Sequence, residues 1–328
     1  MAFNAGMTRR ALLDMAGAAS LSVAAMAAAK AEGIATGPRS EPAPVLFAHQ
    51  TPMRVGQVSL VVRDLALVSG FYRDVLGLSV IETAPGRASL GAGGNVLLVL
   101  EQRPAAPFER QGTAGLFHTA FLMPTRKDLA RWLVHVARNR VRLTGFADHA
   151  VSEAVYLDDP EGNGIEVYSD RAPELWRWDG GTVTMTSDQL NVDELLGLTN
   201  IQVSDYATAP AGLRIGHMHL RVGDVARGQA FYSTAIGLDT TRQRSGAAFL
   251  SSGRYHHHLG INAWRSQGAG ARDANATGIA WFSLEVKDRA VLDAQRARLA
   301  TAGAGVTEMT GGFATADPWG TAIRLVSR

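Results

Sequence analysis

Apolar and polar residues alternate over residues 57–60, the strand pattern continues to Val62, and a helical pattern that carries Phe71-Tyr72 follows. Strict alternation is typical of a strand with one buried face, and an apolar spacing of three to four is typical of an amphipathic helix. Asp64 lies between the two patterns, where a helix N-cap is expected, and Gly77 follows the helix, where a left-handed C-terminal residue is expected. The pattern therefore predicts a strand, a turn and a helix that ends at Gly77.

The same pattern returns 160 residues later. Residues 216–238 repeat the features of residues 56–78: an alternating strand, an Asp, a Phe-Tyr pair and a Gly-Leu pair. A repeat at a constant offset indicates a duplicated structural unit. The chain therefore contains at least two copies of one supersecondary arrangement.

The second halves of the copies also correspond. Residues 115–121 match residues 278–284, and a helical pattern follows each, over 127–138 and 289–302. Each copy then closes with an Asp-Pro-x-Gly turn and an apolar strand pattern. Each copy is predicted to be a module of two βαβββ units, an α+β fold. The predicted organisation is a signal peptide at 1–31, an extended arm at 32–53, modules at 54–170 and 214–328, and a connector at 171–213.

The motifs of these units resemble a known superfamily. A unit that opens with His/Gln-x-x-Leu-x-Val-x-Asp, as at residues 57–64, and closes with Asp-Pro-x-Gly-x-x-Ile-Glu, as at residues 159–166, is similar to the vicinal-oxygen-chelate superfamily. That superfamily includes glyoxalase I, bleomycin-binding proteins and type I extradiol dioxygenases. Residues 115–124, 148–154 and 255–264 most resemble the two-domain catechol-2,3-dioxygenase type. The resemblance implies curved mixed sheets that form cups, with a divalent metal on the open face.

The resemblance also implies where the metal ligands lie. They come from the first strand of each βαβββ unit and, usually as Glu, from its last strand. These positions are Gln57, His118 and Glu166 in the first module and His217, Trp281 and Arg324 in the second.

Neither module on its own provides two histidines and a carboxylate. If units pair across the modules, His118, Glu166 and His217 form a complete set, and this interpretation is favoured. The alternative keeps the modules unswapped, with Gln57, His118 and Glu166 as ligands. The fourth-strand position is occupied by Val99 or Gly260, neither of which can ligate, so both versions leave open coordination positions. Fe(II) is the expected metal, with Mn(II) or another divalent ion as the alternative.

Four further residues are candidates for acid and base catalysis. Tyr156 lies ten residues before Glu166, and His149 lies in a loop that resembles a substrate-contacting segment of the extradiol enzymes. His219 shares a strand face with His217. In a strand over residues 256–262, His258 shares a face with Gly260, and if Gly260 occupies the fourth-strand ligand position, His258 points into the cup beside the metal, where an imidazole could move a proton near neutral pH. His49 and His135 are expected to be solvent-exposed.

The N-terminus and the composition define the expected location. Residues 8–13 resemble a twin-arginine export signature, an Ala-rich apolar stretch follows, and residues 29–31 form an Ala-x-Ala-like cleavage site. The chain is therefore expected to be exported, to the periplasm or beyond, with no stable membrane partner after cleavage. The formal net charge of +2 is fully accounted for by residues 1–31, so charge gives no reason to expect nucleic acid as a partner. Cysteine is absent, which excludes thiolate ligands and a cysteine nucleophile.

The resemblance to the extradiol dioxygenases implies an oxidoreductase of aromatic catabolism. The expected activity is that of an extradiol ring-cleaving dioxygenase that acts on a catechol-like vicinal diol with Fe(II) and O₂. The alternatives are a metal-dependent glyoxalase-like isomerase or lyase, and a non-catalytic protein that binds an aromatic compound or drug. The expected partners are a small aromatic substrate and O₂, and the chain could also form a homo-oligomer.

Overall fold

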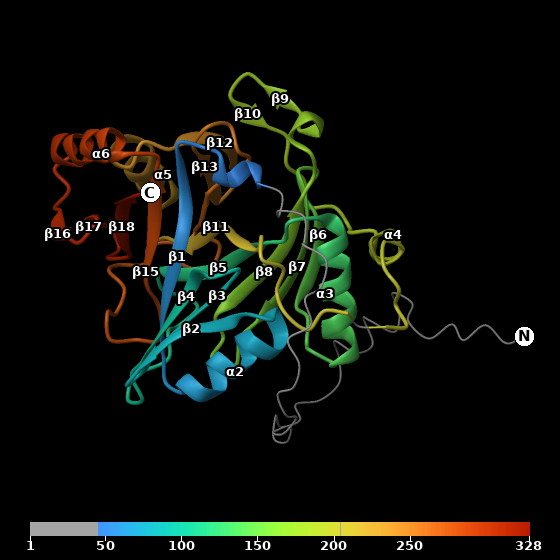
Figure 1. Ribbon diagram of the computed structural model, residues 1–328. Helices are drawn as coiled ribbons and strands as arrows, with labels where there is room; N and C mark the ends of the chain where they lie inside the picture. The colour runs from blue at the N-terminus through green and yellow to red at the C-terminus, as the bar shows by residue number, and fades with distance from the viewer. Residues whose placement is uncertain (1–44, 204) are drawn as a thin grey trace, which may run out of the picture.

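The computed structural model describes residues 45–203 and 205–328. The predicted signal peptide and residues 32–44 of the predicted arm lie outside the described residues. Four βαβββ units follow one another along the chain, as the repeat predicts (Figure 1). The first two units consist of β1 (Met53–Val62), α2 (Leu65–Leu76), β2 (Ser79–Ala84), β3 (Arg87–Ala92) and β4 (Asn95–Gln102), then β5 (Gly115–Leu122), α3 (Arg126–Arg138), β6 (Gly145–Asp148), β7 (Ser152–Asp158) and β8 (Gly164–Asp170).

The second half of the chain repeats this order. In its first unit the helix ends in a π-helical turn, η3 (Phe231–Ala235), directly after α5. The two units consist of β11 (Arg214–Arg221), α5 (Val225–Ala230), β12 (Asp239–Arg244), β13 (Ala247–Ser251) and β14 (Leu259–Asn262), then β15 (Gly278–Val286), α6 (Arg289–Thr301), β16 (Thr307–Met309), β17 (Gly312–Ala316) and β18 (Ala322–Ser327).

The helix ends follow the predicted capping chemistry. The Asp64 side chain accepts a hydrogen bond from the backbone N–H of Leu67, and the Asp224 side chain accepts one from Arg227. Gly77 ends α2 with a φ of 70°, in the left-handed region where glycine carries no steric penalty. The repeated Asp and Gly residues are therefore the start and stop signals of equivalent helices.

The four units form two eight-stranded sheets, and each sheet takes one unit from each half of the chain. One sheet has the order β16-β17-β18-β15-β1-β4-β3-β2, and the other has the order β12-β13-β14-β11-β5-β8-β7-β6. We call them the β1–β15 sheet and the β5–β11 sheet, after their central antiparallel pairs. The predicted pairing across modules is confirmed, because β5 and β8 share a sheet with β11 and not with β1.

In each module one buried hydrogen bond connects the two halves, which lie in different sheets. The Tyr72 hydroxyl donates to Asp159 Oδ2 at 3.4 Å, and the Tyr232 hydroxyl donates to Asp317 Oδ2 at 3.0 Å. Both tyrosines are fully buried, so each phenol needs a polar partner. The repeated Phe-Tyr pair and the repeated Asp-Pro-x-Gly turn are therefore the two sides of one structural contact.

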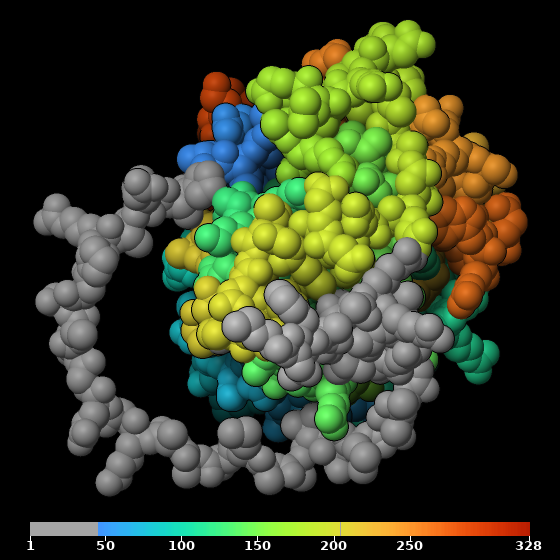
Figure 2. Space-filling model, turned by 90° about the vertical axis from the view of Figure 1, so that its right-hand side faces the viewer, coloured from blue at the N-terminus to red at the C-terminus, as the bar shows by residue number. Residues whose placement is uncertain are grey.

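The connector lies along the outside of the molecule (Figure 2). Its two short strands form a hairpin that extends beyond the sheets (Figure 1), and Glu194 pairs with Arg126 on α3. Before β1, a short 3-10 helix packs close to the β5–β11 sheet. The 3-10 helix before β1 is η1 (Phe47–His49). The connector contains η2 (Pro173–Leu175), β9 (Trp178–Asp179), β10 (Thr182–Val183) and α4 (Val192–Leu196). Across the described ranges, no helix combines the length and the apolar character needed to cross a membrane.

Candidate metal centre and active site

Strand register brings three predicted ligands together on one face of the β5–β11 sheet. His217 on β11 is paired with Ala120 on β5, and Ala120 is paired with Glu166 on β8. His217, Ala120 and Glu166 therefore form a row across the sheet, with the small side chain of Ala120 in the middle. His118 lies two residues before Ala120 on the same strand face, so its imidazole joins the row.

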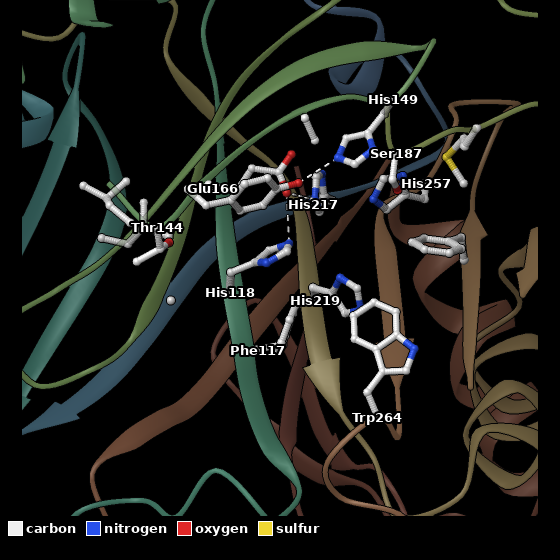
Figure 3. Close-up of a pocket in the computed structure, with 18 of the residues that line it drawn as sticks. Phe117, His118, Thr144, His149, Glu166, Ser187, His217, His219, His257 and Trp264 are labelled. Atoms are coloured by element: carbon white, nitrogen blue, oxygen red, sulfur yellow. Dashed lines mark hydrogen bonds and ion pairs between the residues drawn. The ribbon is translucent and has the colours of Figure 1, made fainter. Parts of the chain in front are cut away.

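The polar atoms of these residues converge in a buried space. Nε2 of His118 lies 3.0 Å and Nε2 of His217 lies 3.3 Å from Oε2 of Glu166, and all three side chains are buried (Figure 3). One potential ligand atom from each residue lies within 4.8 Å of the others. Burial alone would raise the pKa of Glu166, but the His217 and His118 imidazoles hold it well below its usual value. The carboxylate therefore stays ionised between the two histidines.

Two nitrogen atoms of this group have no hydrogen-bond partner. Nε2 of His118 approaches Glu166 closely, but the contact lacks hydrogen-bond geometry, and Nδ1 of His217 has no partner either. A buried polar atom without a partner costs about 1–3 kcal/mol. A divalent cation beside the carboxylate would use imidazole lone pairs and remove part of this cost, so these residues fit a metal.

The alternative ligand set is not assembled. Gln57 lies on β1, in the other sheet, and does not line the cavity described below. In that sheet Arg324 stacks on Trp281 with 3.6 Å between the guanidinium carbon and the ring centre, and Trp281 donates to Glu101. A cation and an indole therefore occupy the positions that correspond to the ligands, and the interpretation based on Gln57 is wrong.

A cavity of about 480 Å³ opens in front of the three residues. Its wall is mainly apolar, and the sticks in Figure 3 show it extending from Thr144, past the histidines, to Trp264 and Ser187. This size is within the range of pockets that enclose small organic ligands. The lining includes Phe117, His118, Thr144, His149, Tyr156, Asp158, Glu166, Met185, Ser187, His217, His219, Arg244, Phe249, His257 and Trp264.

His149 and Tyr156 form a hydrogen-bonded pair on one wall of the cavity. Nδ1 of His149 lies 2.8 Å from the carbonyl of Thr186, which can only accept, so this nitrogen carries the proton. Nε2 of His149 then accepts from the Tyr156 hydroxyl, 2.7 Å away. Burial, followed by the charge of Glu166, raises the pKa of Tyr156 well above its usual value. The phenol therefore remains protonated and is a hydrogen-bond donor.

His219 lies on the opposite side of His118. The centres of the two rings are 4.8 Å apart, and Nε2 of His219 accepts from the Asn262 amide at 3.0 Å. A Cβ atom at Gly260 would lie 3.0 Å from the His219 ring. Gly260 therefore leaves the space that this imidazole occupies. Burial lowers the pKa of His219 well below its usual value, so the ring is neutral.

The predicted position of His258 is wrong. Its Nδ1 lies 3.0 Å from the Ser251 hydroxyl and its Nε2 lies 3.0 Å from the carbonyl of Ala48, and it does not line the cavity. The reason is that β14 begins only at Leu259, so the alternation assumed for residues 256–262 does not hold before that residue. In the sequence, Gly253 was the sign that a turn comes before this segment. In the structure its φ is 65°.

His257 occupies the place expected for His258. Its ring centre is 4.1 Å from that of His217, and it lines the cavity (Figure 3). Nε2 of His256 lies 2.7 Å from the Asp170 carboxylate and donates to it, so in the singly protonated ring His256 Nδ1 is an acceptor. Nδ1 of His257, 2.8 Å away, therefore donates to His256, and Nε2 of His257 keeps a lone pair. Burial lowers the pKa of His257 well below its usual value, which keeps it in this neutral form.

The fold and the site together define a class of protein. A family model described as the Glyoxalase/Bleomycin resistance protein/Dioxygenase superfamily matches residues 54–167 and 214–325, more than half of the chain. The chain belongs to this superfamily.

Individual relatives narrow the comparison. The chain is 35% identical over 269 residues to a catechol-2,3-dioxygenase of Bacillus subtilis (strain 168), which covers 80% of this chain and 93% of that protein. It is 28% identical over 120 residues to biphenyl-2,3-diol 1,2-dioxygenase 3 of Rhodococcus globerulus, covering 36% and 63% of the two chains. Glyoxalase I from Zea mays has the same fold, with a TM-score of 0.52 at 15% identity over 86% of this chain and 94% of that one. The sequence relationship is thus to dioxygenases, and the structural likeness to glyoxalase I shows the fold alone.

Proposed function

We propose that the chain is an extradiol dioxygenase that cleaves the ring of a catechol-like vicinal diol with Fe(II) and O₂. The convergence of His118, His217 and Glu166 at a buried cavity carries this proposal. Two imidazoles and one carboxylate are the set that holds non-haem Fe(II) and leaves positions open. The relationship to the Bacillus subtilis catechol-2,3-dioxygenase supports the same reading. The metal, when bound, would supply the redox chemistry between the diol and O₂.

The protein's own side chains orient the substrate and handle its protons. Phe117, Phe249 and Trp264 offer flat apolar surfaces on which an aromatic ring can pack, and they exclude water from the space beside the ligands. Nε2 of His257 accepts a hydrogen bond from a substrate hydroxyl and takes its proton. The role proposed from the sequence for His258 therefore falls to His257.

Tyr156 and His149 form a second functional pair in the wall of the cavity. The Tyr156 hydroxyl, held by His149, is a neutral donor that faces the cavity. It can turn from His149 to donate a hydrogen bond to a substrate oxygen as negative charge develops there, while His149 Nε2 remains its acceptor in the resting site. His219 fixes the orientation of the His118 ring by packing on it. Preorganised donors of this type stabilise developing charge without rearrangement of solvent.

Reconstitution tests the proposal directly. The full-length chain is loaded anaerobically with Fe(II), mixed with catechol and exposed to air, while O₂ consumption and the absorbance of a yellow ring-fission product are recorded. We expect both signals from the wild type and neither from Glu166→Gln, which removes the carboxylate but keeps its shape. An iron-loaded protein that consumes no O₂ with any vicinal diol would disprove the activity. Conversion of a glutathione hemithioacetal instead would favour a glyoxalase-like isomerase.

We further propose that the chain is exported by the twin-arginine route before it acts. The residues that support this are Arg9 and Arg10 and the Ala-x-Ala sequence at 29–31. Replacement of both arginines by lysine should retain the protein in the cytoplasm, as measured by cell fractionation. Unchanged export of that variant would refute the route.

A further inference from the structure

Among the residues that the structure describes, one Lys or Arg side chain lines the cavity. Arg244, at the end of β12, lines the cavity near Met185, Phe249 and Trp264. All other basic residues along this wall are histidines. A guanidinium is permanently charged and presents five N–H donors, so it differs from these histidines as a potential contact for a ligand.

The hydrogen bonds of Arg244 leave its charge unbalanced. Nη1 donates to the Ser187 hydroxyl at 3.2 Å and Nη2 donates to the carbonyl of Met185, and both acceptors are neutral. Within the described part of the chain, no carboxylate forms an ion pair with Arg244, and Asp188 acts on it only through its charge at longer range. Three of its five donors remain for another acceptor.

A second arginine increases this positive surplus. Arg242 lies two residues earlier on β12, on the same strand face, and its Nε is buried without a hydrogen-bond partner. Burial, followed by the charge of Arg242, lowers the pKa of Arg244. Arg244 is only partly buried, so water screens much of its charge, and an anion that enters the cavity beside it would gain a charge-assisted hydrogen bond.

The rest of the cavity determines where an anion can go. Asp158 lines the end of the cavity near Thr144, and a carboxylate there repels a second negative charge. In Figure 3 Thr144 lies on one side of the metal ligands, while Ser187 and Trp264 lie on the other. The hydrogen-bond partners of Arg244 place its guanidinium beside Ser187. A ligand seated at the metal centre that extends a negative group past Ser187 would therefore bring it to Arg244.

From this arrangement we propose that the substrate is a catechol that carries an anionic substituent, a carboxylate on a short arm, and that Arg244 binds this carboxylate. The inference rests on the proposed function and adds the chemical class of the substrate. The apolar surfaces of Met185 and Phe249 border the path of the arm, and the cavity of about 480 Å³ has room for a ring with a side chain. Arg244 is thus a specificity residue.

Matched acid and amide pairs test the proposal on the Fe(II)-loaded full-length chain. The pairs are 3,4-dihydroxybenzoate, 3,4-dihydroxyphenylacetate and 3,4-dihydroxyphenylpropionate, each compared with its own carboxamide, which has nearly the same shape and no charge. We expect kcat/KM for at least one acid to exceed that of its amide by about 10- to 100-fold, the range for a hydrogen bond to a charged group. Arg244→Met should reduce that ratio toward one, and Arg244→Lys should retain part of it.

The control variant separates Arg244 from general charge effects. Arg265→Met makes the same chemical change at a residue that pairs with Gln111 outside the cavity, and it should keep the wild-type ratio. Wild-type protein with no preference for the acid in any pair would overturn the proposal, as would an Arg244→Met variant with an unchanged ratio. If no diol is turned over, the proposed function fails, and calorimetric binding of each acid and amide still decides whether Arg244 selects the anion.

Discussion

Small residues next to the histidines determine how closely the candidate metal centre is packed. A Cβ atom at Gly164 would lie 2.1 Å from the carbonyl oxygen of Phe117 and 3.2 Å from the Cβ of His118. Gly260 leaves room for the His219 ring in the same way. Ala120 separates His217 from Glu166 along their shared row. The ligand atoms can converge because the positions between and beside the imidazoles carry almost no side chain.

Replacement of one ligand at a time distinguishes the two ligand sets considered from the sequence. His217→Ala should weaken Fe(II) or Mn(II) binding by about 100-fold or more, beyond the ~10–100-fold that outer residues cost. Gln57→Ala is the matched control, and it should bind the metal as the wild type does, because Gln57 lies in the other sheet. Metal content after dialysis, measured by mass spectrometry, checks both variants. Loss of metal from the Gln57 variant alone would contradict the assignment.

At the residue scale, a side chain's direction could be predicted from the sequence only where the backbone around it is a regular strand. His118, Glu166 and His217 lie on regular strands in register with the repeat, so the positions that the family resemblance implies fall on one sheet face, where the structure brings the three side chains together. His257 was missed because the segment before β14 is a turn, where side chains do not alternate. No periodic signal in the sequence separates His257 from its two neighbours.

At the scale of single elements, the ends of the helices are set by a few local residues. Gly77 has a φ of 70°, and an added Cβ atom there would lie 2.5 Å from the backbone nitrogen of Ala209. Gly70, in the middle of the same helix, has ordinary helical geometry and nothing within 4 Å of its potential Cβ. The two glycines of α2 therefore have opposite structural roles.

Alanine substitution at these two glycines should change stability in opposite directions. Gly77→Ala should lower the free energy of unfolding by at least about 1–2 kcal/mol, because an L-residue is strained in the left-handed region. Gly70→Ala should raise it by up to about 1 kcal/mol, because alanine favours the helix more than glycine does. Urea unfolding followed by circular dichroism measures both changes. Equal effects of the two substitutions would show that the end of α2 is not a fixed point of the fold.

At the scale of the whole molecule, the segment before β1 is fastened to the β5–β11 sheet by two buried histidines. Nε2 of His49 donates to the carbonyl of Ile215 at 3.0 Å, and Nε2 of His258 donates to the carbonyl of Ala48 at 3.0 Å. The expectation that His49 is solvent-exposed was wrong, since only 8% of its surface is accessible. The segment before β1 is thus held to distant parts of the chain by the His49 and His258 imidazoles, and burial lowers the pKa of both, which keeps them neutral.

This arrangement makes stability depend on pH. Burial lowers the pKa of His49 from 6.5 to about 4, so its contribution to stability is complete above pH 6.5 and is lost as the pH falls from 6.5 toward 4. The expected loss from His49 alone is about 2 kcal/mol between neutral pH and about pH 5. His49→Gln keeps a donor for Ile215 and removes the titration, so its unfolding free energy should fall less on acidification. Parallel pH curves for the variant and the wild type would argue against this role.

The sequence by itself determined the four βαβββ units, the caps that begin and end their helices, and the three candidate ligands that lie on regular strands. These features follow from local periodicity and from the conformational preferences of residues such as Asp64 and Gly77. Only the tertiary structure decided which unit pairs with which, because both pairings satisfy the same strand patterns. It also decided that His257 faces the cavity while His258 secures the N-terminal segment, and that Arg244 lies in the cavity wall. Those outcomes depend on contacts between residues far apart in the chain, and such contacts leave no periodic pattern in the sequence.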